Sequence, residues 1–270
     1  MSVHATDIRV SYGKREILHG VDFTALPGHV TAIVGPNGSG KTTLLKALTG
    51  EVPTTGHVRL NGDETRALRP EVLATRRAVL AQATSLAFPF TVLEVVRLGL
   101  TAGVATAAPR ETAALPHAAL TRVGLEGFEG RFYAELSGGE KQRVQLARVL
   151  VQIWQPTLDG APRWLFLDEP VSSLDIAHQL LVMGIAADYA KAGGGVVAVM
   201  HDLNLTAIFA DAVTLIEAGR VGERGTPEEV LTDTNLSRAY GCALSMNAAP
   251  SAGTPFFLPQ MARLTREAAE

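Results

Sequence analysis

The sequence predicts an α/β fold with a mostly parallel sheet and an inserted helical subdomain. Short apolar runs alternate with helical segments along much of the 270-residue chain, which is typical of a parallel sheet with helices on its faces. Between about residues 82 and 151 the strand-like runs disappear and helical periodicity takes over, which predicts the insertion. Hydrophobic residues make up 47% of the chain, so a sizeable core can be buried.

Short apolar runs have the length and composition of buried strands. These runs are 30–34, 164–167, 196–200 and 213–217. A glycine-rich turn follows the first run, and a helix is expected over Lys41–Thr49 because its leucines share one face. Gly50 suits the C-terminus of that helix. Within the insertion, helical periodicity is visible over 92–99 and 118–123.

Changes in this pattern predict the domain boundaries. We expect one domain with a core in two segments, a helical subdomain and a partly irregular extension: 1–242, with its core in about 1–82 and 152–242 and the subdomain in about 83–151, then 243–270. Small residues, Ala and Pro dominate 103–109, which predicts a loop at the edge of the subdomain. The prolines Pro250, Pro255 and Pro259 predict the irregularity of the extension.

Composition excludes several classes of protein. The formal net charge of −3 lacks the basic excess of a nucleic-acid binder, so no nucleic-acid partner is expected. Cys242 is the only cysteine, so no internal disulfide can form. Residues 1–12 lack the apolar core of a signal peptide, and no run approaches the ~18 apolar residues of a membrane span. We therefore expect a cytoplasmic protein whose membrane role, if any, comes through a partner.

The turn after the first predicted strand matches the phosphate-binding pattern G-x-x-x-x-G-K-[ST]. Its residues are Gly35, Pro36, Asn37, Gly38, Ser39, Gly40, Lys41 and Thr42. Backbone N–H groups of such a loop and the following helix N-terminus bind phosphate oxygens. The lysine neutralises the β- and γ-phosphates, and the Thr42 hydroxyl is a ligand for Mg²⁺. A simple glycine turn capping a helix would not explain the preceding strand and the Lys-Thr pair together.

Two adjacent acids, Asp168 and Glu169, follow the strand predicted over 164–167. Carboxylates at the end of a buried strand are costly unless they meet a cation, and ligand sites in parallel sheets lie at the carboxyl ends of the strands. Asp168 is therefore expected to hold Mg²⁺, and Glu169 to orient or deprotonate an attacking water. If the two acids stood alone, they could simply mark the turn at which the strand ends. Because a phosphate-binding loop is also present, the catalytic interpretation is favoured.

Ser137, Gly138, Gly139 and Glu140 precede a helix expected over 141–152. Ser137 and Glu140 fit a capping box, S-x-x-E. Capping leaves further N–H groups at the helix start, which favour an anion. A compact monomer has no second phosphate to bind at this helix start. In a dimer, the γ-phosphate bound by the partner subunit can fill the site.

The run Leu-Ser-Gly-Gly-Glu-Lys-Gln-Arg at 136–143 resembles the signature motif of the ATPases of ATP-binding-cassette (ABC) transporters. The resemblance extends over roughly residues 5–240. It implies a P-loop NTPase (RecA-like) core with an antiparallel N-terminal β subdomain and an inserted α-helical subdomain. It also implies an ATPase that binds ATP and Mg²⁺.

The resemblance assigns roles to residues that would be weak signals alone. Tyr12 is similar to the aromatic residue that stacks on adenine, and Gln82 to the glutamine that contacts Mg²⁺ and the water and senses the membrane subunit. Asp175 resembles the aspartate of the loop that crosses the dimer interface. His201 resembles the histidine that bonds the γ-phosphate. Glu169, His201 and Gln82 are thus the expected catalytic residues.

The family's mechanism implies a homodimer with composite sites and in-line attack of water on the γ-phosphoryl group. One subunit would supply Gly35 to Thr43 with Asp168, Glu169 and His201, and its partner Ser137 to Glu140 with Asp175. Hydrolysis removes the bridging phosphate and lets the dimer open.

Finer resemblance points to the haem-import ATPases of bacterial type II importers. It rests on residues 85–99, on the helix residues 143–150 and on the long connection 154–163. It implies two integral permease subunits, a periplasmic substrate-binding protein and a peripheral position on the cytoplasmic face of the inner membrane. No residue of the chain identifies the substrate, so ferric siderophore or cobalamin import stays open. A non-transport ABC ATPase and an exporter cassette are further alternatives.

The segment 86–90, Leu-Ala-Phe-Pro-Phe, is apolar for a loop. Either it contacts the core of the subdomain, or Phe88 or Phe90 lines a groove for a cytoplasmic helix of the permease.

Overall fold

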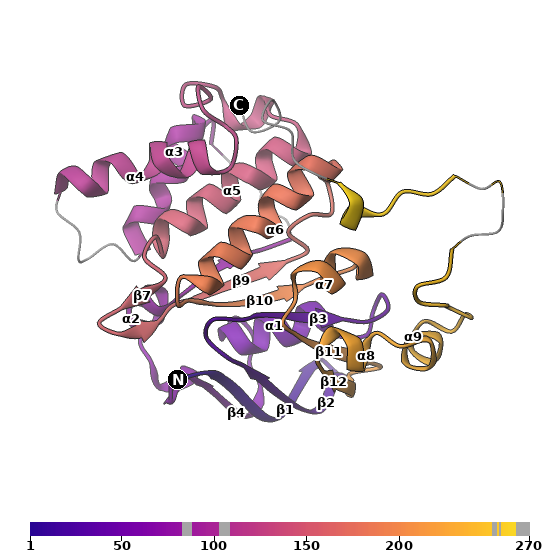
Figure 1. Ribbon diagram of the computed structural model, residues 1–270. Helices are drawn as coiled ribbons and strands as arrows, with labels where there is room; N and C mark the ends of the chain where they lie inside the picture. The colour runs from indigo at the N-terminus through magenta and orange to yellow at the C-terminus, as the bar shows by residue number, and fades with distance from the viewer. Residues whose placement is uncertain (83–87, 103–108, 250–252, 254, 263–270) are drawn as a thin grey trace.

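The computed structural model describes residues 1–82, 88–102, 109–249, 253 and 255–262. Figure 1 shows a central sheet with a helical layer over one face and an antiparallel sheet beyond the other. The central sheet has the strand order β12-β11-β3-β10-β9-β6, in which β12 is antiparallel to β11 and the other pairs are parallel. Its strands are β3 (Val30–Val34), β6 (Arg77–Leu80), β9 (Trp164–Asp168), β10 (Gly195–Val199), β11 (Ala212–Glu217) and β12 (Arg220–Gly225).

The N-terminal sheet is antiparallel, as the family resemblance implied. Its strand order is β2-β1-β4-β5, with β1 (Val3–Tyr12), β2 (Arg15–Ala25), β4 (Thr55–Leu60) and β5 (Asp63–Glu64). Helix α1 (Lys41–Thr49) lies between this sheet and the central one, contacting β1, β9 and β10. Its leucines and Phe166 join one buried cluster with the N-terminal sheet.

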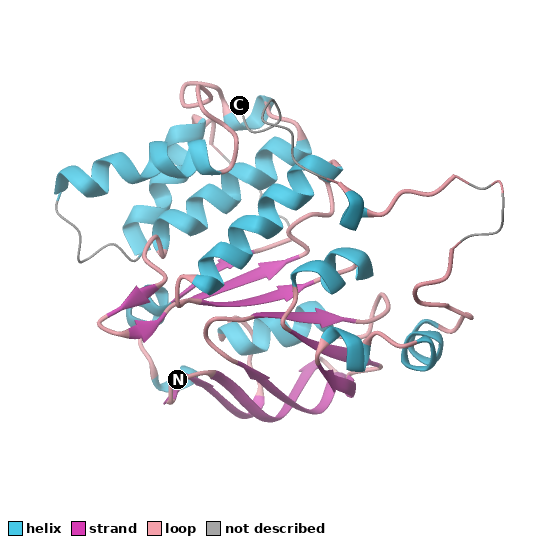
Figure 2. Cartoon of the chain, viewed as in Figure 1, coloured by secondary structure: helices cyan, strands magenta, loops and turns pink. Residues whose placement is uncertain are grey.

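The other face of the central sheet is covered by helices (Figure 2). Helices α5 (Gly138–Gln152) and α6 (Ile176–Lys191) contact its strands, and α3 (Val92–Arg97) and α4 (Pro109–Arg122) pack against α5. Strand neighbours alternate between the two layers: Leu165 and Leu167 pack with these helices, whereas Trp164 and Phe166 pack on the side of α1. Strands β3, β9, β10 and β11 are therefore buried on both faces, which is why their sequences are continuously apolar.

Shorter elements complete the chain. They are α2 (Pro70–Arg76), α7 (Leu203–Phe209), α8 (Pro227–Val230), α9 (Asp233–Tyr240), the hairpin β7 (Thr157–Leu158) and β8 (Ala161–Pro162), and the 3-10 turns η1 (Thr65–Ala67), η2 (Leu98–Ala102), η3 (Tyr133–Glu135) and η4 (Pro259–Met261). The hairpin occupies the long connection noted at 154–163. In the described part of the extension the single regular element is η4, which contacts α7.

The predicted α/β fold and the four predicted strands are confirmed, with shifts of one residue at some ends. Helix α1 has the predicted bounds, and Gly50 caps it in the left-handed conformation. The helix expected from residue 141 begins at Gly138, because Ser137 is already its N-cap. The loop predicted over 103–109 lies outside the described residues except for Pro109, which begins α4.

The apolar segment 86–90 is described from Phe88 onward. Phe90 packs partly buried against the core, while the neighbouring Phe88 is 71% exposed. The core-contact interpretation therefore holds for Phe90 but not for Phe88. In the described ranges, no helix has the length and apolar character needed to cross a bilayer.

Candidate functional site

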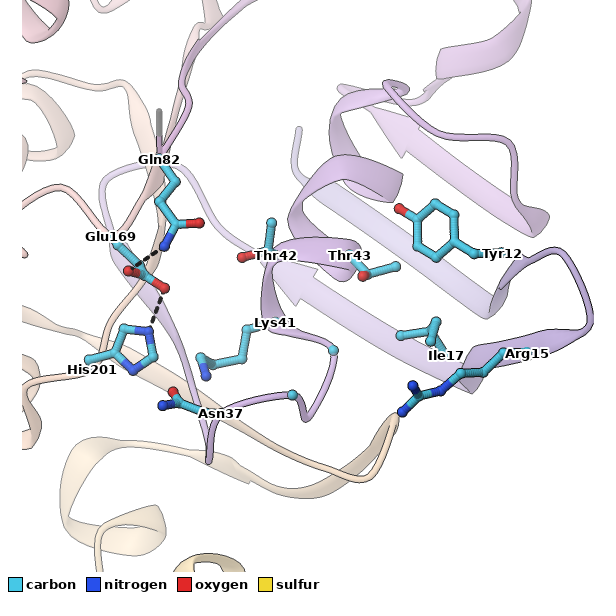
Figure 3. Close-up of a pocket in the computed structure, with 12 residues that line it drawn as sticks. Tyr12, Arg15, Ile17, Asn37, Lys41, Thr42, Thr43, Gln82, Glu169 and His201 are labelled. Carbon is cyan, nitrogen blue, oxygen red and sulfur yellow. Dashed lines mark hydrogen bonds and ion pairs between the residues drawn. The ribbon is translucent and has the colours of Figure 1, made fainter. Parts of the chain in front are cut away.

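A cavity of about 680 Å³ opens at the carboxyl edge of the central sheet (Figure 3). Parallel strands bring their carboxyl ends to one edge, so residues distant in sequence meet there. The cavity is lined by Tyr12, Arg15, Ile17, Asn37, Gly38, Gly40, Lys41, Thr42, Thr43, Gln82, Glu169 and His201. Gln82, Glu169 and His201 come from the loops after β6, β9 and β10, whereas Tyr12, Arg15 and Ile17 come from the N-terminal sheet.

The loop between β3 and α1 is shaped by glycines. Gly35 has a φ of +146°, and a Cβ atom there would lie 2.2 Å from the Ile216 carbonyl oxygen. The Lys41 Nζ donates to the carbonyl oxygens of Gly35 (2.8 Å) and Pro36 (3.0 Å). Burial lowers the pKa of Lys41, and the charges of Glu169 and then Asp168 oppose that shift. The ammonium is thus held beside two carbonyl oxygens of the loop in the lining of the cavity, where an anion would stabilise its charge.

Thr42 and Asp168 form a pair of oxygen ligands beside the loop. The Thr42 hydroxyl donates to Asp168 Oδ1 at 3.0 Å, and Asp168 is only 2% exposed. Burial raises the pKa of Asp168, while the hydrogen bond from Thr42 opposes the rise. A hydroxyl and a desolvated carboxylate fit Mg²⁺, which prefers hard oxygen ligands. A cation there would relieve the cost of burying the carboxylate.

Glu169 is fixed from several directions. The Gln82 Nε2 donates to its Oε2 at 2.8 Å, and the His201 Nε2 lies 2.5 Å from its Oε1 (Figure 3). The Gln142 Nε2 on α5 donates to the Glu169 carbonyl oxygen at 2.9 Å, and the Glu169 N–H donates to the Val199 carbonyl oxygen at 3.2 Å. Glu169 also has a φ of +52°, which a residue with a side chain adopts only where its surroundings impose it. The carboxylate therefore points into the cavity in one defined orientation.

The predicted anion site at the start of α5 lies in a separate cavity of about 390 Å³. The predicted residues Ser137, Gly138, Gly139, Glu140 and Asp175 all line it, and none of its lining residues belongs to the first cavity. The capping box is present: the Glu140 N–H donates to Ser137 Oγ (3.3 Å), and the Ser137 N–H donates to Glu140 Oε2 (2.7 Å). Hydrogen bonding of the carboxylate to the Ser137 side chain, and then to the Ser137 backbone, lowers the pKa of Glu140.

Asp175 caps the next helix beside that cavity. Its Oδ1 accepts from the His178 N–H at 3.0 Å and lies 2.7 Å from His178 Nδ1. Hydrogen bonding to the backbone lowers the pKa of Asp175, so the carboxylate stays ionised. The predicted residues thus fall into two groups, one at each cavity, and the two cavities share no lining residue within one chain.

Sequence reasoning placed most of the residues that line the first cavity. Gly35, Pro36, Ser39 and Asp168 do not line it but lie directly behind it, in the loop or against Thr42. Arg15, Ile17 and Gln142 were not singled out. Arg15 and Ile17 lie on β2 across the turn from Tyr12, so a predicted N-terminal hairpin could have found them; no sequence signal linked Gln142 to Glu169.

Comparison with known proteins identifies the family. The family model described as "ABC transporter" matches residues 18–172, more than half of the chain. The chain belongs to the ABC transporter family.

Curated relatives within this family match almost the whole chain. A protein of Jannaschia sp. (strain CCS1) named "Hemin import ATP-binding protein HmuV" is 62% identical over 96% of this chain and 94% of its own length. Proteins of the same name from Mesorhizobium japonicum and Roseobacter denitrificans are 57% and 59% identical, over 96% and 97% of this chain and 98% and 99% of their own.

Solved structures of ABC cassettes share the fold. An ATP-binding subunit of an ABC transporter superposes with a TM-score of 0.75 at 23% identity, covering 90% of this chain and 95% of that one. A cassette in its ADP conformation gives a TM-score of 0.74 at 22% identity, covering 89% and 98%. The resemblance to ABC ATPases and the P-loop NTPase fold are therefore confirmed.

Proposed function

We propose that this ABC cassette binds and hydrolyses ATP to drive haem import across the inner membrane. The observation that carries the ATPase assignment is the convergence of Lys41, Thr42, Gln82, Glu169 and His201 on one cavity, with Asp168 bonded to Thr42. The relatives at 53–62% identity support haem as the substrate, since their names describe hemin import.

The residues take the following roles in the proposed reaction. The backbone of Gly35 to Thr43 and the Lys41 ammonium bind the phosphates, and the Tyr12 ring stacks on the adenine. Thr42, Asp168 and Gln82 hold Mg²⁺, which when bound neutralises charge on the β- and γ-phosphate oxygens.

In this proposal Glu169 and His201 act directly in the hydrolysis step. The carboxylate of Glu169 orients the water and accepts its proton as the water attacks in line. His201, hydrogen-bonded to that carboxylate in the same cavity, would bond the γ-phosphate. Gln82 bonds the other carboxylate oxygen, so its loop reports the state of the site.

We propose that two copies complete each other's sites. Ser137, Gly138, Gly139, Glu140 and Asp175 form a separate cavity at a helix N-terminus, which favours an anion. In an isologous dimer, the γ-phosphate held by one copy would fill this cavity of the other. ATP then closes the dimer, and hydrolysis lets it open.

The transporter would place the dimer against two permease subunits, with a periplasmic protein delivering haem, at the cytoplasmic face of the inner membrane. The helical subdomain, about residues 83–151, is the part we assign to contact with the permease, and the exposed Phe88 is its candidate contact. The ATPase domain is assigned to residues 1–242, and the segment 243–270 to an extension.

Reconstitution tests the proposal directly. The chain is combined in proteoliposomes with its permease subunits, and ATP-dependent uptake is measured for haem, a ferric siderophore and cobalamin. Haem uptake above the other substrates supports the assignment. Uptake of another substrate overturns haem alone, whereas absence of ATP hydrolysis in the complex overturns the ATPase assignment.

A further inference from the structure

The turn between β11 and β12 lies against the candidate site but belongs to none of its motifs. It consists of Ala218 and Gly219, with φ values of +46° and +76°. Two consecutive residues in the left-handed region make a tight two-residue hairpin turn. Ala218 carries a side chain in a conformation that costs free energy, so its surroundings hold the turn in this shape.

Gly219 bonds both to the phosphate-binding loop and to β2, the two segments that carry opposite walls of the cavity. Its N–H donates to the Ser39 carbonyl oxygen of the phosphate-binding loop at 2.8 Å. Its carbonyl oxygen accepts from the His19 N–H of β2 at 2.9 Å. Since β2 also carries Ile17, which lines the cavity beside Tyr12, the turn links the phosphate side of the cavity to the base side.

The fit between the turn and β2 leaves no room for a side chain. A Cβ atom on Gly219 would lie 2.0 Å from the Ile17 carbonyl oxygen and 2.7 Å from His19 Cδ2. The same hairpin touches the start of the phosphate-binding loop, where Gly35 approaches the Ile216 carbonyl oxygen. Any residue larger than glycine would therefore push the two walls apart or tilt one of them.

Helix α9 holds the hairpin from outside. The Arg238 guanidinium donates to both carboxylate oxygens of Glu217, at distances from 2.9 to 3.3 Å. The Arg220 Nη1 donates to the His19 carbonyl oxygen at 3.0 Å. Such exposed ion pairs add little to the free energy of unfolding. Bonds to both oxygens of the planar Glu217 carboxylate nevertheless fix its orientation relative to the Arg238 guanidinium. The hairpin is therefore oriented on both sides of its turn.

Tyr240, two residues after Arg238, is partly buried at the end of α9. Burial raises the pKa of Tyr240, and the backbone of Gly35 opposes that rise. Helix α9 thus supports the hairpin through the Arg238–Glu217 pair.

We propose that the Ala218–Gly219 turn is a spacer that sets the distance between the phosphate-binding loop and β2, the strand beside the proposed base site. Gly219 is its positioning residue. The inference rests on the proposed nucleotide site and adds a determinant of its width. A ligand that bridges both walls depends on the spacer. A ligand that occupies only the phosphate loop does not.

The chain contains a matched control for the test. Asp159 and Gly160, between β7 and β8, form a turn with φ values of +51° and +75°, and a Cβ atom on Gly160 would meet nothing within 4 Å. Gly219→Ala and Gly160→Ala therefore impose the same backbone strain, but only the first presses on the cavity walls. Thermal unfolding of both variants measures the shared strain.

Calorimetric titration of the full chain with ADP and with inorganic tripolyphosphate separates the two kinds of ligand. Relative to Gly160→Ala, Gly219→Ala should raise the Kd for ADP by about tenfold or more, because a displaced β2 loses contact with the ligand and each loss of about 1.4 kcal/mol is tenfold in Kd. The Kd for tripolyphosphate should change by less than about threefold. In turnover, the KM for ATP should rise while kcat at saturating ATP is largely kept.

Arg238→Gln and Arg238→Lys test the spacer if Gly219→Ala does not fold. Arg238→Gln should show the same selective loss of ADP affinity, to a smaller degree. Arg238→Lys should retain part of the ADP affinity that Arg238→Gln loses. Equal weakening of both ligands, or ADP binding equal to the control in the folded variants, overturns the inference. If the unaltered chain binds neither ADP nor ATP, the proposed function itself fails.

Discussion

Replacing Glu169 by glutamine separates chemistry from binding at the candidate site. The exchange keeps the length and shape of the side chain, which accepts one hydrogen bond from Gln82 and lies against His201. An amide retains a single acceptor oxygen and cannot take a proton from water at neutral pH. The phosphate-binding loop and the Thr42–Asp168 pair are untouched.

The expected magnitude follows from the lost proton transfer. A positioned general base contributes about 10²- to 10⁴-fold to a rate, which corresponds to about 3–5.5 kcal/mol in the activation free energy. The effect on folding is much smaller. The replacement is nearly isosteric and Gln82 keeps one acceptor, so the free energy of unfolding should change by less than about 1 kcal/mol.

The assay is ATP hydrolysis by the reconstituted complex, with ATP-dependent dimerisation followed by size-exclusion chromatography. Glu169→Gln should bind ATP, accumulate as a dimer and turn over at least about a hundredfold more slowly. Glu229→Gln is the matched control, because its carboxylate caps α8 and lines neither cavity of the site. Hydrolysis by Glu169→Gln at the native rate would refute the role assigned to this carboxylate.

Other predictions address the metal, the capping box and the permease contact. Thr42→Val removes the hydroxyl bonded to Asp168 and should raise the Mg²⁺ concentration for half-maximal ATPase by about tenfold or more, whereas Thr42→Ser should not. The lowered pKa of Glu140 means that its stabilisation is complete above the ordinary glutamate pKa and is lost as pH falls through the lowered value. The difference in unfolding midpoint between the native chain and Glu140→Gln should therefore shrink on acidification; an unchanged difference would contradict this. Phe88→Ala should leave thermal unfolding unchanged, because the ring is 71% exposed, but weaken permease binding in a pull-down; Phe256→Ala, on the tail, is its control.

The elements predicted well from sequence are those whose pattern has one local cause. Strands β3, β9, β10 and β11 are buried on both faces and therefore continuously apolar. The phosphate-binding loop needs glycines at fixed positions, since Gly35 and Gly40 have left-handed φ values and close neighbours. Local sequence was sufficient in these cases because local geometry sets the residue type.

The features that sequence did not predict depend on tertiary contacts. Strand β12 is only partly buried, so it lacks an apolar run. Arg15 and Ile17 line the cavity because β1 and β2 form a hairpin, and Gln142 reaches Glu169 because α5 packs beside the loop after β9. A predicted hairpin over β1 and β2 could have found Arg15 and Ile17. The contact of Gln142 with Glu169 comes from long-range packing, which leaves no local pattern in the sequence.

Helix α5 connects the two cavities within one chain. Its first residues, Gly138 to Glu140, line the second cavity. Gln142, two residues after Glu140, donates to the carbonyl oxygen of Glu169 at the first cavity. Glu169 is held in a left-handed conformation, and the hydrogen bond from Gln142 is one of the contacts that hold its backbone there. A movement of the α5 N-terminus therefore acts on the backbone of the candidate base. In the proposed dimer, contact of that N-terminus with the partner's phosphate would bear on this chain's own carboxylate, so the two composite sites cannot be fully independent.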